Sequence, residues 1–273
     1  MPTPRLTGAR YVIPLREGGS MPAVVDTREA GPFVVKFLGA GQGAKALVAE
    51  SLGAHLALSL GLPVPRPAFI TLGEGFGKGE PDPEIQDILR GSIGLNFGLA
   101  WLPGALPFDP AADRDISPEL AANIVWFDAF ITNVDRAPRN VNLLVCREQV
   151  WMIDHGASLY IHHQWKGWEA RAQSAFSHIQ DHVLLPFSGD LEQADARLRP
   201  LLTDDALRAA VDNIPAEWLE TDTGFASLDE HRQRYVDYLS QRLHGPRAWL
   251  REAVAARERG PVPYAPRATH RVV

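Results

Sequence analysis

The chain has 273 residues, of which 45% are hydrophobic and 22% charged, the usual balance of a globular protein. Its net charge of −6 argues against a nucleic-acid partner, which requires a basic surface. With the single cysteine Cys146, no intrachain disulfide is possible, and no apolar run is long enough to span a membrane. We therefore expect a cytoplasmic protein without a membrane span, and we expect Cys146 to be a small core residue.

The first elements are two short strands, predicted at residues 11–15 and 23–26, with a glycine-rich loop between them. Gly18 and Gly19 lie in this loop, where the lack of a side chain lets backbone amides approach a phosphate closely. No Gly-Lys-Ser/Thr sequence follows, so the loop is not of the Walker type. The alternative is an ordinary hairpin turn.

The next strand, predicted at residues 32–38, carries a lysine among apolar residues. Lys36 shares a strand face with Val34 and Leu38, which argues for burial because alternate residues lie on one face. A buried ammonium group needs a charged partner, since burying it alone is costly. The alternative is an edge-strand lysine in solvent.

A helix predicted at residues 44–60 carries the candidate partner of that lysine, Glu50, although a solvated helix glutamate is the competing interpretation. The sequence Gly-Leu-Pro-Val-Pro at 61–65 ends the helix. A strand is predicted at residues 67–72. Residues 73–87 are rich in glycine, proline and acidic residues, and we expect an exposed loop there.

An apolar stretch at residues 93–102 precedes a linker and then a second helix, predicted at residues 118–132. Ser117 suits the N-cap position of this helix, and Pro118 suits its first turn. Asp128 lies within the helix, and we expect it to be a helix residue and not a ligand.

The most informative stretch is a predicted hairpin whose apolar strands are residues 141–146 and 150–153. Asp135 and Asn140 stand just before its first strand, and Asp154 stands just after its second. A hairpin brings its two open ends together, so these three polar side chains should converge at one mouth.

An aspartate, an asparagine five residues later and an aspartate after a hairpin form a layout typical of phosphoryl transfer. Asp135 would accept the proton of the attacking hydroxyl, while Asn140 and Asp154 would hold magnesium through oxygen ligands. Asn142 is the competing metal amide because it lies two residues further on, with the same strand parity. The alternative is a polar turn whose side chains bond only their own backbone.

After the hairpin come an aromatic and polar segment, several amphipathic helices and a tail. The segment contains four histidines that raise the possibility of zinc: His162, His163, His178 and His182. No cysteine or closely spaced acidic residue supports a zinc site, so we do not favour one. The helices are predicted at residues 204–213, 228–244 and 248–259.

The two signatures around the hairpin resemble those of HipA-like kinases, which share this loop style with phosphatidylinositol 3/4-kinases. They are Asp-Arg-Ala-Pro-Arg-Asn at 135–140 and Ile-Asp-His-Gly at 153–156. Ala137 stands where many relatives carry histidine, and His155 stands where common protein kinases carry phenylalanine. More loosely, the resemblance extends from about residue 11 to about residue 182.

The resemblance implies an α+β, two-lobed protein kinase-like fold. The N-lobe, residues 1–102, would have an antiparallel sheet with one helix and bind the nucleotide. The mainly helical C-lobe, residues 103–260, would carry the catalytic and metal-binding loops, and residues 261–273 would form a tail. ATP and Mg²⁺ would lie between the lobes, with residues 99–102 as the hinge that meets adenine.

The implied activity is ATP-dependent phosphoryl transfer to a serine or threonine of an unknown protein. A small-molecule or lipid kinase on the same fold is the alternative, as is a nucleotide-binding regulatory module without turnover. The implied catalytic residues are Asp135, Lys36 and Asn140, and the implied metal ligands are Asn140 and Asp154. The implied nucleotide-binding residues are Gly18, Gly19, Ser20, Lys36, Glu50, Leu99, Trp101 and Leu102.

Overall fold

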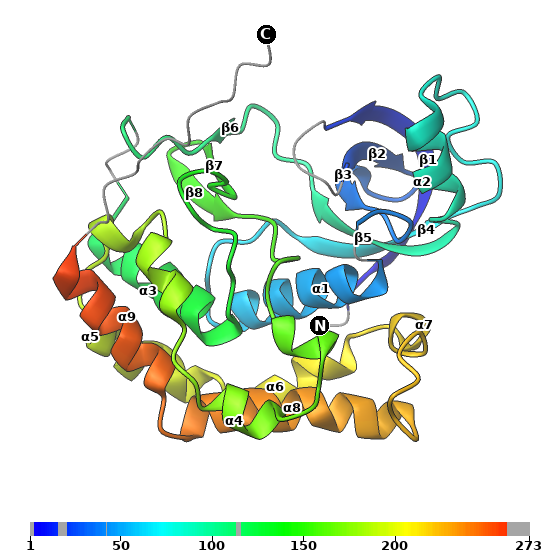
Figure 1. Cartoon of the computed structure of the whole chain (residues 1–273). Helices are drawn as coiled ribbons and strands as arrows, with labels where there is room; N and C mark the ends of the chain where they lie inside the picture. Colours follow the sequence, from blue (N-terminus) through cyan, green and yellow to red (C-terminus); the bar gives the residue numbers. More distant parts are fainter. Residues whose placement is uncertain (1–2, 16–20, 42, 113–115, 261–273) are drawn as a thin grey trace, which may run out of the picture.

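The structure is a computed structural model that describes residues 3–15, 21–41, 43–112 and 116–260. A sheet forms its N-terminal part and helices form most of the rest (Figure 1). The strands of the sheet are β1 (Arg5–Pro14), β2 (Ala23–Thr27), β3 (Gly31–Lys36), β4 (Pro67–Leu72) and β5 (Gly94–Ala100). Neighbouring strands run antiparallel in the order β1-β2-β3-β5-β4, and the first residues of β1 also pair in parallel with β4, so the sheet curls strongly.

The two faces of the sheet bury different sets of side chains. Val25, Phe33 and Val35 belong to an apolar cluster inside the curl. Phe97 belongs to the larger cluster that continues into the helical part, and its strand partner is Lys36. Lys36 is thus carried on the face of the sheet that looks toward the rest of the molecule.

Helix α1 (Ala44–Ser59) lies between the sheet and the C-terminal helices (Figure 1). It contacts β5 on one side, and α6 (Asp204–Asp212) and α7 (Ala216–Leu219) on the other. Leucines such as Leu47 and Leu52 are buried along it, as expected for a helix that is covered on both sides. Glu50 is also buried in this helix, with only 1% of its surface exposed.

The helical part is organised around α3, which is buried along nearly its whole length. Its helices are α3 (Pro118–Ile131), α4 (Trp168–Ala172), α5 (Leu191–Leu198), α6, α7, α8 (Leu228–His244) and α9 (Ala248–Arg259). The Ser117 hydroxyl caps α3 by accepting the Leu120 N–H, and Thr132 ends the helix in the left-handed conformation. The chain then turns directly into the loop that precedes the hairpin.

The hairpin consists of β7 (Leu143–Cys146) and β8 (Gln149–Met152), and β6 (Leu106–Pro107) adds a short third strand. The Cys146 side chain is buried and its thiol donates to the Pro103 carbonyl at 3.7 Å, consistent with a core role. Since β6 belongs to the segment that leaves the N-terminal sheet, the hairpin is tied to the connection between the two parts of the molecule.

The α+β class with an N-terminal sheet and a helical C-terminal part is confirmed, but two local predictions are wrong. The predicted loop at 73–87 gives way to helix α2 (Pro83–Arg90), which begins with an Asp82 side-chain cap and Pro83 in its first turn. Strand β1 starts at Arg5, six residues before the predicted start, because its opening pairs with the distant strand β4. Within the described ranges, no helix is long and apolar enough to cross a membrane.

Candidate functional site

Three charged residues from distant parts of the chain meet at one point. Lys36 leaves the end of β3, and its ammonium nitrogen lies 3.1 Å from Glu50 Oε1 of α1. The same nitrogen lies 2.5 Å from Asp154 Oδ2, just after β8. The Glu50 side chain is 2% exposed, whereas those of Lys36 and Asp154 are 16% and 29% exposed. This ion cluster is therefore sealed at Glu50 and open to solvent at Asp154.

The turn after β8 binds Glu50 through its backbone. The N–H groups of His155 and Gly156 donate to the two carboxylate oxygens of Glu50, each at 3.0 Å. Asp154 adopts a left-handed backbone with φ of 55°, which is uncommon for a residue other than glycine. A side-chain carbon at Gly156 would lie only 3.0 Å from Glu50 Oε1, so any larger residue there would press on the Glu50 carboxylate.

The charges in the ion cluster support one another. Burial alone would lower the pKa of Lys36, but the carboxylates of Glu50 and Asp154 raise it above its ordinary value. Burial would raise the pKa of Asp154, yet the Lys36 ammonium group holds it at about 2. For Glu50, burial prevails over the attraction of Lys36 and raises the pKa above its ordinary value. Lys36 and Asp154 are thus charged at neutral pH.

His155 lies beneath α1 and is completely buried. Burial, together with the nearby charge of Arg136, lowers the pKa of His155 to about 3, so the imidazole is neutral. A side-chain carbon at Gly53 would lie 2.6 Å from the His155 Cβ, so only glycine lets α1 approach this closely. His155 thus contacts α1 twice, through its ring at Gly53 and through its backbone N–H at Glu50.

The loop between α3 and β7 positions the other predicted polar residues. The amide nitrogen of Asn140 donates to Asp135 Oδ2 at 2.7 Å, and that of Asn142 donates to the Asp135 carbonyl at 3.1 Å. The Asp135 N–H in turn donates to the Asn133 side chain at 3.1 Å. Asp135 and Asn140 are thus brought together as predicted, and Asn142 lies beside them.

Arg136 joins the two ends of the hairpin and explains how this loop stays next to Asp154. Its Nη1 donates to the carbonyl oxygens of Asn142 and Ile153, one from each end. The Ile153 N–H also donates to the Asn142 carbonyl at 3.1 Å. The predicted convergence at the hairpin mouth is therefore held by a buried arginine whose role the sequence analysis did not recognise.

A buried network around Asp128 holds Arg136 in turn. Asp128 Oδ2 accepts from Arg136 Nε at 2.6 Å and lies 2.9 Å from His182 Nε2, while Oδ1 accepts from Asn133 at 3.0 Å. Burial would raise the pKa of Asp128, but Arg136 and His182 hold it well below its ordinary value. Asp128 is a helix residue, as expected, and its signal in the sequence is a charge in the middle of an otherwise apolar helix. His182 is a partner of this network, and no group of three metal-ligating His, Cys, Asp or Glu side chains occurs in the described part of the chain.

The residues near Asp154 fit a hard divalent cation in their donor chemistry. Asp154 supplies a charged carboxylate that is still partly exposed. Asn140 uses its amide nitrogen to contact Asp135, which leaves its side-chain oxygen as the potential ligand. Asn142 is arranged in the same way toward the Asp135 carbonyl, so both candidate amides have the oxygen ligand that Mg²⁺ prefers.

The structure describes the predicted hinge segment but not the predicted glycine loop. Gly18, Gly19 and Ser20 lie outside the described residues. Leu99 lies in β5, and the segment continues with Trp101, whose N–H donates to the Pro32 carbonyl at 3.1 Å. Trp101 remains 38% exposed, and the Leu102 carbonyl accepts from Ala105 N–H at 3.1 Å. Part of the backbone of this segment is therefore already bonded within the protein.

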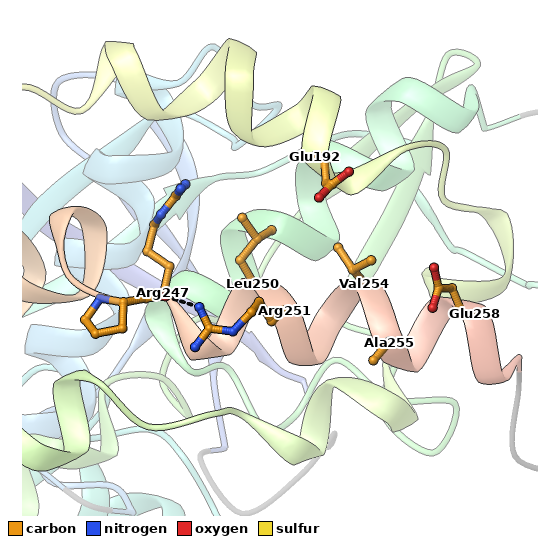
Figure 2. Close-up of a pocket in the computed structure, with 8 residues that line it drawn as sticks. Glu192, Arg247, Leu250, Arg251, Val254, Ala255 and Glu258 are labelled. Carbon is orange, nitrogen blue, oxygen red and sulfur yellow. Dashed lines mark hydrogen bonds between the residues drawn. The ribbon is translucent and has the colours of Figure 1, made fainter.

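A surface hollow elsewhere in the molecule has no relation to this site. It lies between α5 and α9, where Glu192 faces Leu250 and Val254 (Figure 2). Arg251 and Glu258 also line it. None of the residues that line the hollow belongs to the ion cluster or to the loop before β7, so the candidate site remains at the hairpin mouth.

A strand lysine paired with a helical glutamate, next to a loop Asp and Asn and a further aspartate, is typical of protein kinase-like phosphotransferases. A profile of the family described as HipA-like kinase matches residues 12–250, so the chain belongs to the HipA-like kinase family. Among solved structures, the chain is similar to the crystal structure of CtkA, a proinflammatory kinase of Helicobacter pylori. That alignment has a TM-score of 0.55 and 14% identity, and it covers 94% of this chain and 98% of that one. No curated protein matches the chain.

Proposed function

We propose that the protein transfers the γ-phosphoryl group of ATP to the hydroxyl of a protein serine or threonine, with Mg²⁺ as cofactor. The observation that carries the proposal is the ion cluster, in which Lys36 lies 3.1 Å from Glu50 and 2.5 Å from Asp154. Asp154, its most exposed member, follows β8 at the hairpin mouth, where the loop with Asp135 and Asn140 is held by Arg136. Membership of the HipA-like kinase family supports kinase activity, and the HipA-like resemblance is the reason for proposing a protein acceptor.

An apolar row across the sheet supports adenine binding beside the cluster. Ile13 pairs with Val24, Val24 with Val34, and Val34 with Leu99, so the four residues lie side by side on adjacent strands. Val34 shares its strand face with Lys36, two residues away. Ile13 is 53% exposed at the end of this row, which leaves apolar surface free to contact a flat base. We assign the adenine to this row, with Trp101 and Leu102 at its hinge side.

The proposed mechanism rests on position and charge. Lys36 would bind the phosphates, and its pKa, raised by its two carboxylate partners, keeps it charged. Asp135 would orient the acceptor hydroxyl and take its proton, while its contact with Asn140 fixes the direction of the carboxylate. Asp154 and Asn140 would hold Mg²⁺, which neutralises phosphate charge when it is bound.

The division of labour follows the two parts of the chain. We propose that residues 1–102 bind the nucleotide, that residues 103–260 carry the catalytic and metal ligands, and that residues 261–273, which lie outside the described residues, are a tail. A cytoplasmic location belongs to the same proposal and is supported by the single buried cysteine, Cys146, which permits no disulfide within the chain.

The test is incubation of the protein with γ-labelled ATP, Mg²⁺ and a lysate of its host. The Asp135→Asn variant is the matched control because it keeps size and one oxygen but removes the charge. Label in the protein fraction that depends on Asp135 supports the proposal. Label confined to a lipid or small-molecule fraction would mean that the acceptor is a lipid or a small molecule and not a protein. Absence of both transfer and Mg²⁺-dependent ATP binding would contradict the function.

A further inference from the structure

We propose that residues 216–222, here called the clasp, position the Lys36–Glu50 pair from the C-terminal helical part of the molecule. The proposal rests on the proposed function, because it assigns a role in that same site. The clasp comprises α7 and the three residues that follow it. In sequence it lies more than a hundred residues from either member of the pair, and it reaches each by a separate route.

The first route leads through Trp218 to β5, the strand that pairs with the strand of Lys36. This side chain is 2% exposed, and its indole N–H donates to the Leu95 carbonyl of β5 at 3.1 Å. Its ring meets Phe69 edge-on with centroids 5.5 Å apart, and Phe69 meets Phe97 in the same manner at 6.3 Å. Phe97 is the strand partner of Lys36. A continuous aromatic chain therefore runs from the clasp to the residue paired with Lys36.

The second route leads to the helix of Glu50 through Asp222. Its carboxylate lies 3.1 Å from the ammonium group of Lys45, in the first turn of α1. The same Lys45 donates to the His162 carbonyl at 2.6 Å, in the segment that follows Asp154. Helix α7 also contacts α1 directly (Figure 1). The clasp thus holds the first turn of α1 in place, and Lys45 links that turn to the segment that follows Asp154.

The two routes add to the other contacts that join the sheet and α1 to the helical part, which are the chain connection at residues 101–106, the packing of α1 on α6 and the bonds of Glu50 to the turn after β8. Rotation of the sheet away from the helices would break the indole bond and expose a large buried side chain, which is unfavourable. The geometry that places Lys36 next to Glu50 is therefore maintained without nucleotide. Trp218 and Asp222 are positioning residues: each acts through another residue and touches no reacting atom.

Trp218→Phe is the decisive variant because it keeps an aromatic ring and removes the bond to Leu95. Trp249→Phe is its matched control. The Trp249 indole is equally buried and donates to the Arg242 carbonyl at 2.9 Å, but entirely within the helical part. Both variants lose one indole hydrogen bond, so a purely structural role predicts similar effects of both on the site.

Two measurements distinguish the variants. Hydrogen exchange of α1 and β5 amides without ATP should become about tenfold faster in Trp218→Phe and stay unchanged in Trp249→Phe, because exchange reports local opening. The KM for ATP should rise about threefold in Trp218→Phe alone, with a smaller change in kcat. The exchange measurement does not depend on catalysis, so a wild-type protein without ATP-dependent transfer would contradict the proposed function and still leave the clasp tested.

Equal α1 exchange in the two tryptophan variants would overturn the proposal, and so would faster exchange with an unchanged KM for ATP. If Trp218→Phe does not fold, Asp222→Asn takes its place. Its control is Glu252→Gln, which removes another partly exposed ion pair, that of Glu252 with Arg259 inside α9. Faster exchange in the first turns of α1 in Asp222→Asn alone supports the clasp, and unchanged exchange there overturns it.

Discussion

Two charged clusters lie on either side of the hairpin mouth, and they differ in their access to solvent. In the ion cluster, the Lys36 and Asp154 side chains are 16% and 29% exposed. In the second cluster, the side chains of Arg136 and Asp128 are 0% exposed, and His182 covers the carboxylate. Both pair a cation with an aspartate, but only the first has an edge open to solvent, where the proposed nucleotide phosphates would bind. Solvent accessibility of the charged side chains, and not their pairing, thus separates the proposed ligand site from the structural network.

The largest effect on stability should come from a substitution in the buried network around Asp128. Asp128→Ala leaves Arg136 buried without its carboxylate, and we expect the free energy of unfolding to fall by about 3–5 kcal/mol, as for other broken buried pairs. Urea denaturation would measure it. Asp128→Asn, which retains an acceptor oxygen, should lose less. A loss below about 1 kcal/mol in Asp128→Ala would show that the network does not hold the fold.

At the open site, the largest effect should be on chemistry and not on stability. Asp135→Asn should lower the rate of transfer by roughly a hundredfold or more, within the usual range for a general base, while ATP affinity and the thermal midpoint hold. Steady-state kinetics and calorimetry on the same preparation would show the split. A variant that loses ATP affinity in parallel would place Asp135 in nucleotide binding.

The proposal that Asn140 supplies the metal-binding amide oxygen can be tested by substituting Asn140 and Asn142 separately. Asn140→Ala should lower transfer and raise the Mg²⁺ concentration needed for half-maximal activity, because Asn140 supplies a proposed ligand oxygen. Asn142→Ala is the matched control, since Asn142 contacts the Asp135 backbone in a similar way. A shifted Mg²⁺ requirement in Asn142→Ala alone would mean that Asn142 is the ligand.

Lys36→Ala should give a smaller loss, of at least about tenfold in transfer, or on the order of 1.4 kcal/mol of transition-state stabilisation. The fold should stay intact because Glu50 still accepts the backbone N–H groups of His155 and Gly156. Circular dichroism and kinetics would check both parts. An unfolded variant would assign Lys36 a structural role, like that of Arg136 in the buried network around Asp128.

The smallest effect concerns pH. The folded-state pKa of His155 is lowered from an ordinary 6.5 to about 3. The unfolded chain therefore binds the proton more readily, and stability present above pH 6.5 is lost as pH falls toward 3. His155→Phe should reduce the loss of unfolding free energy between pH 6.5 and 5 by about 1 kcal/mol per pH unit. A pH slope in His155→Phe equal to that of the wild type would contradict a buried neutral His155.

Regular periodicity made much of the fold predictable. Strand β4 and helices α8 and α9 have the predicted bounds. They could be predicted because their apolar residues are regularly spaced and because residues such as glycine and proline, which interrupt helices and strands, flank them. Helix α2 was missed because a composition rich in glycine and proline outweighed the cap signal of Asp82, Pro83 and Glu84. The start of β1 was missed because the pairing that defines it is with β4, about sixty residues away.

For the site, local motifs predicted which residues would meet, but not what holds them. Glu50 was the candidate partner of Lys36, and the pair is present. Asp135 and Asn140 were expected to converge at the hairpin mouth, and they lie in contact. The direct Lys36–Asp154 contact, the bridging role of Arg136 and the clasp depend on tertiary contacts between distant segments. No local sequence pattern encodes such contacts, so only the charge within an apolar helix at Asp128 gave a hint.

The most direct test of the central claim is calorimetric titration of ATP into wild-type protein and Asp154→Ala, each with and without Mg²⁺. Asp154 is the most exposed member of the ion cluster, and its pKa of about 2 keeps it anionic at neutral pH. The proposed site predicts Mg²⁺-dependent binding in the wild type that is abolished or strongly weakened in Asp154→Ala. Unchanged affinity with unchanged metal dependence would contradict the assignment of this cluster as the ATP and magnesium site.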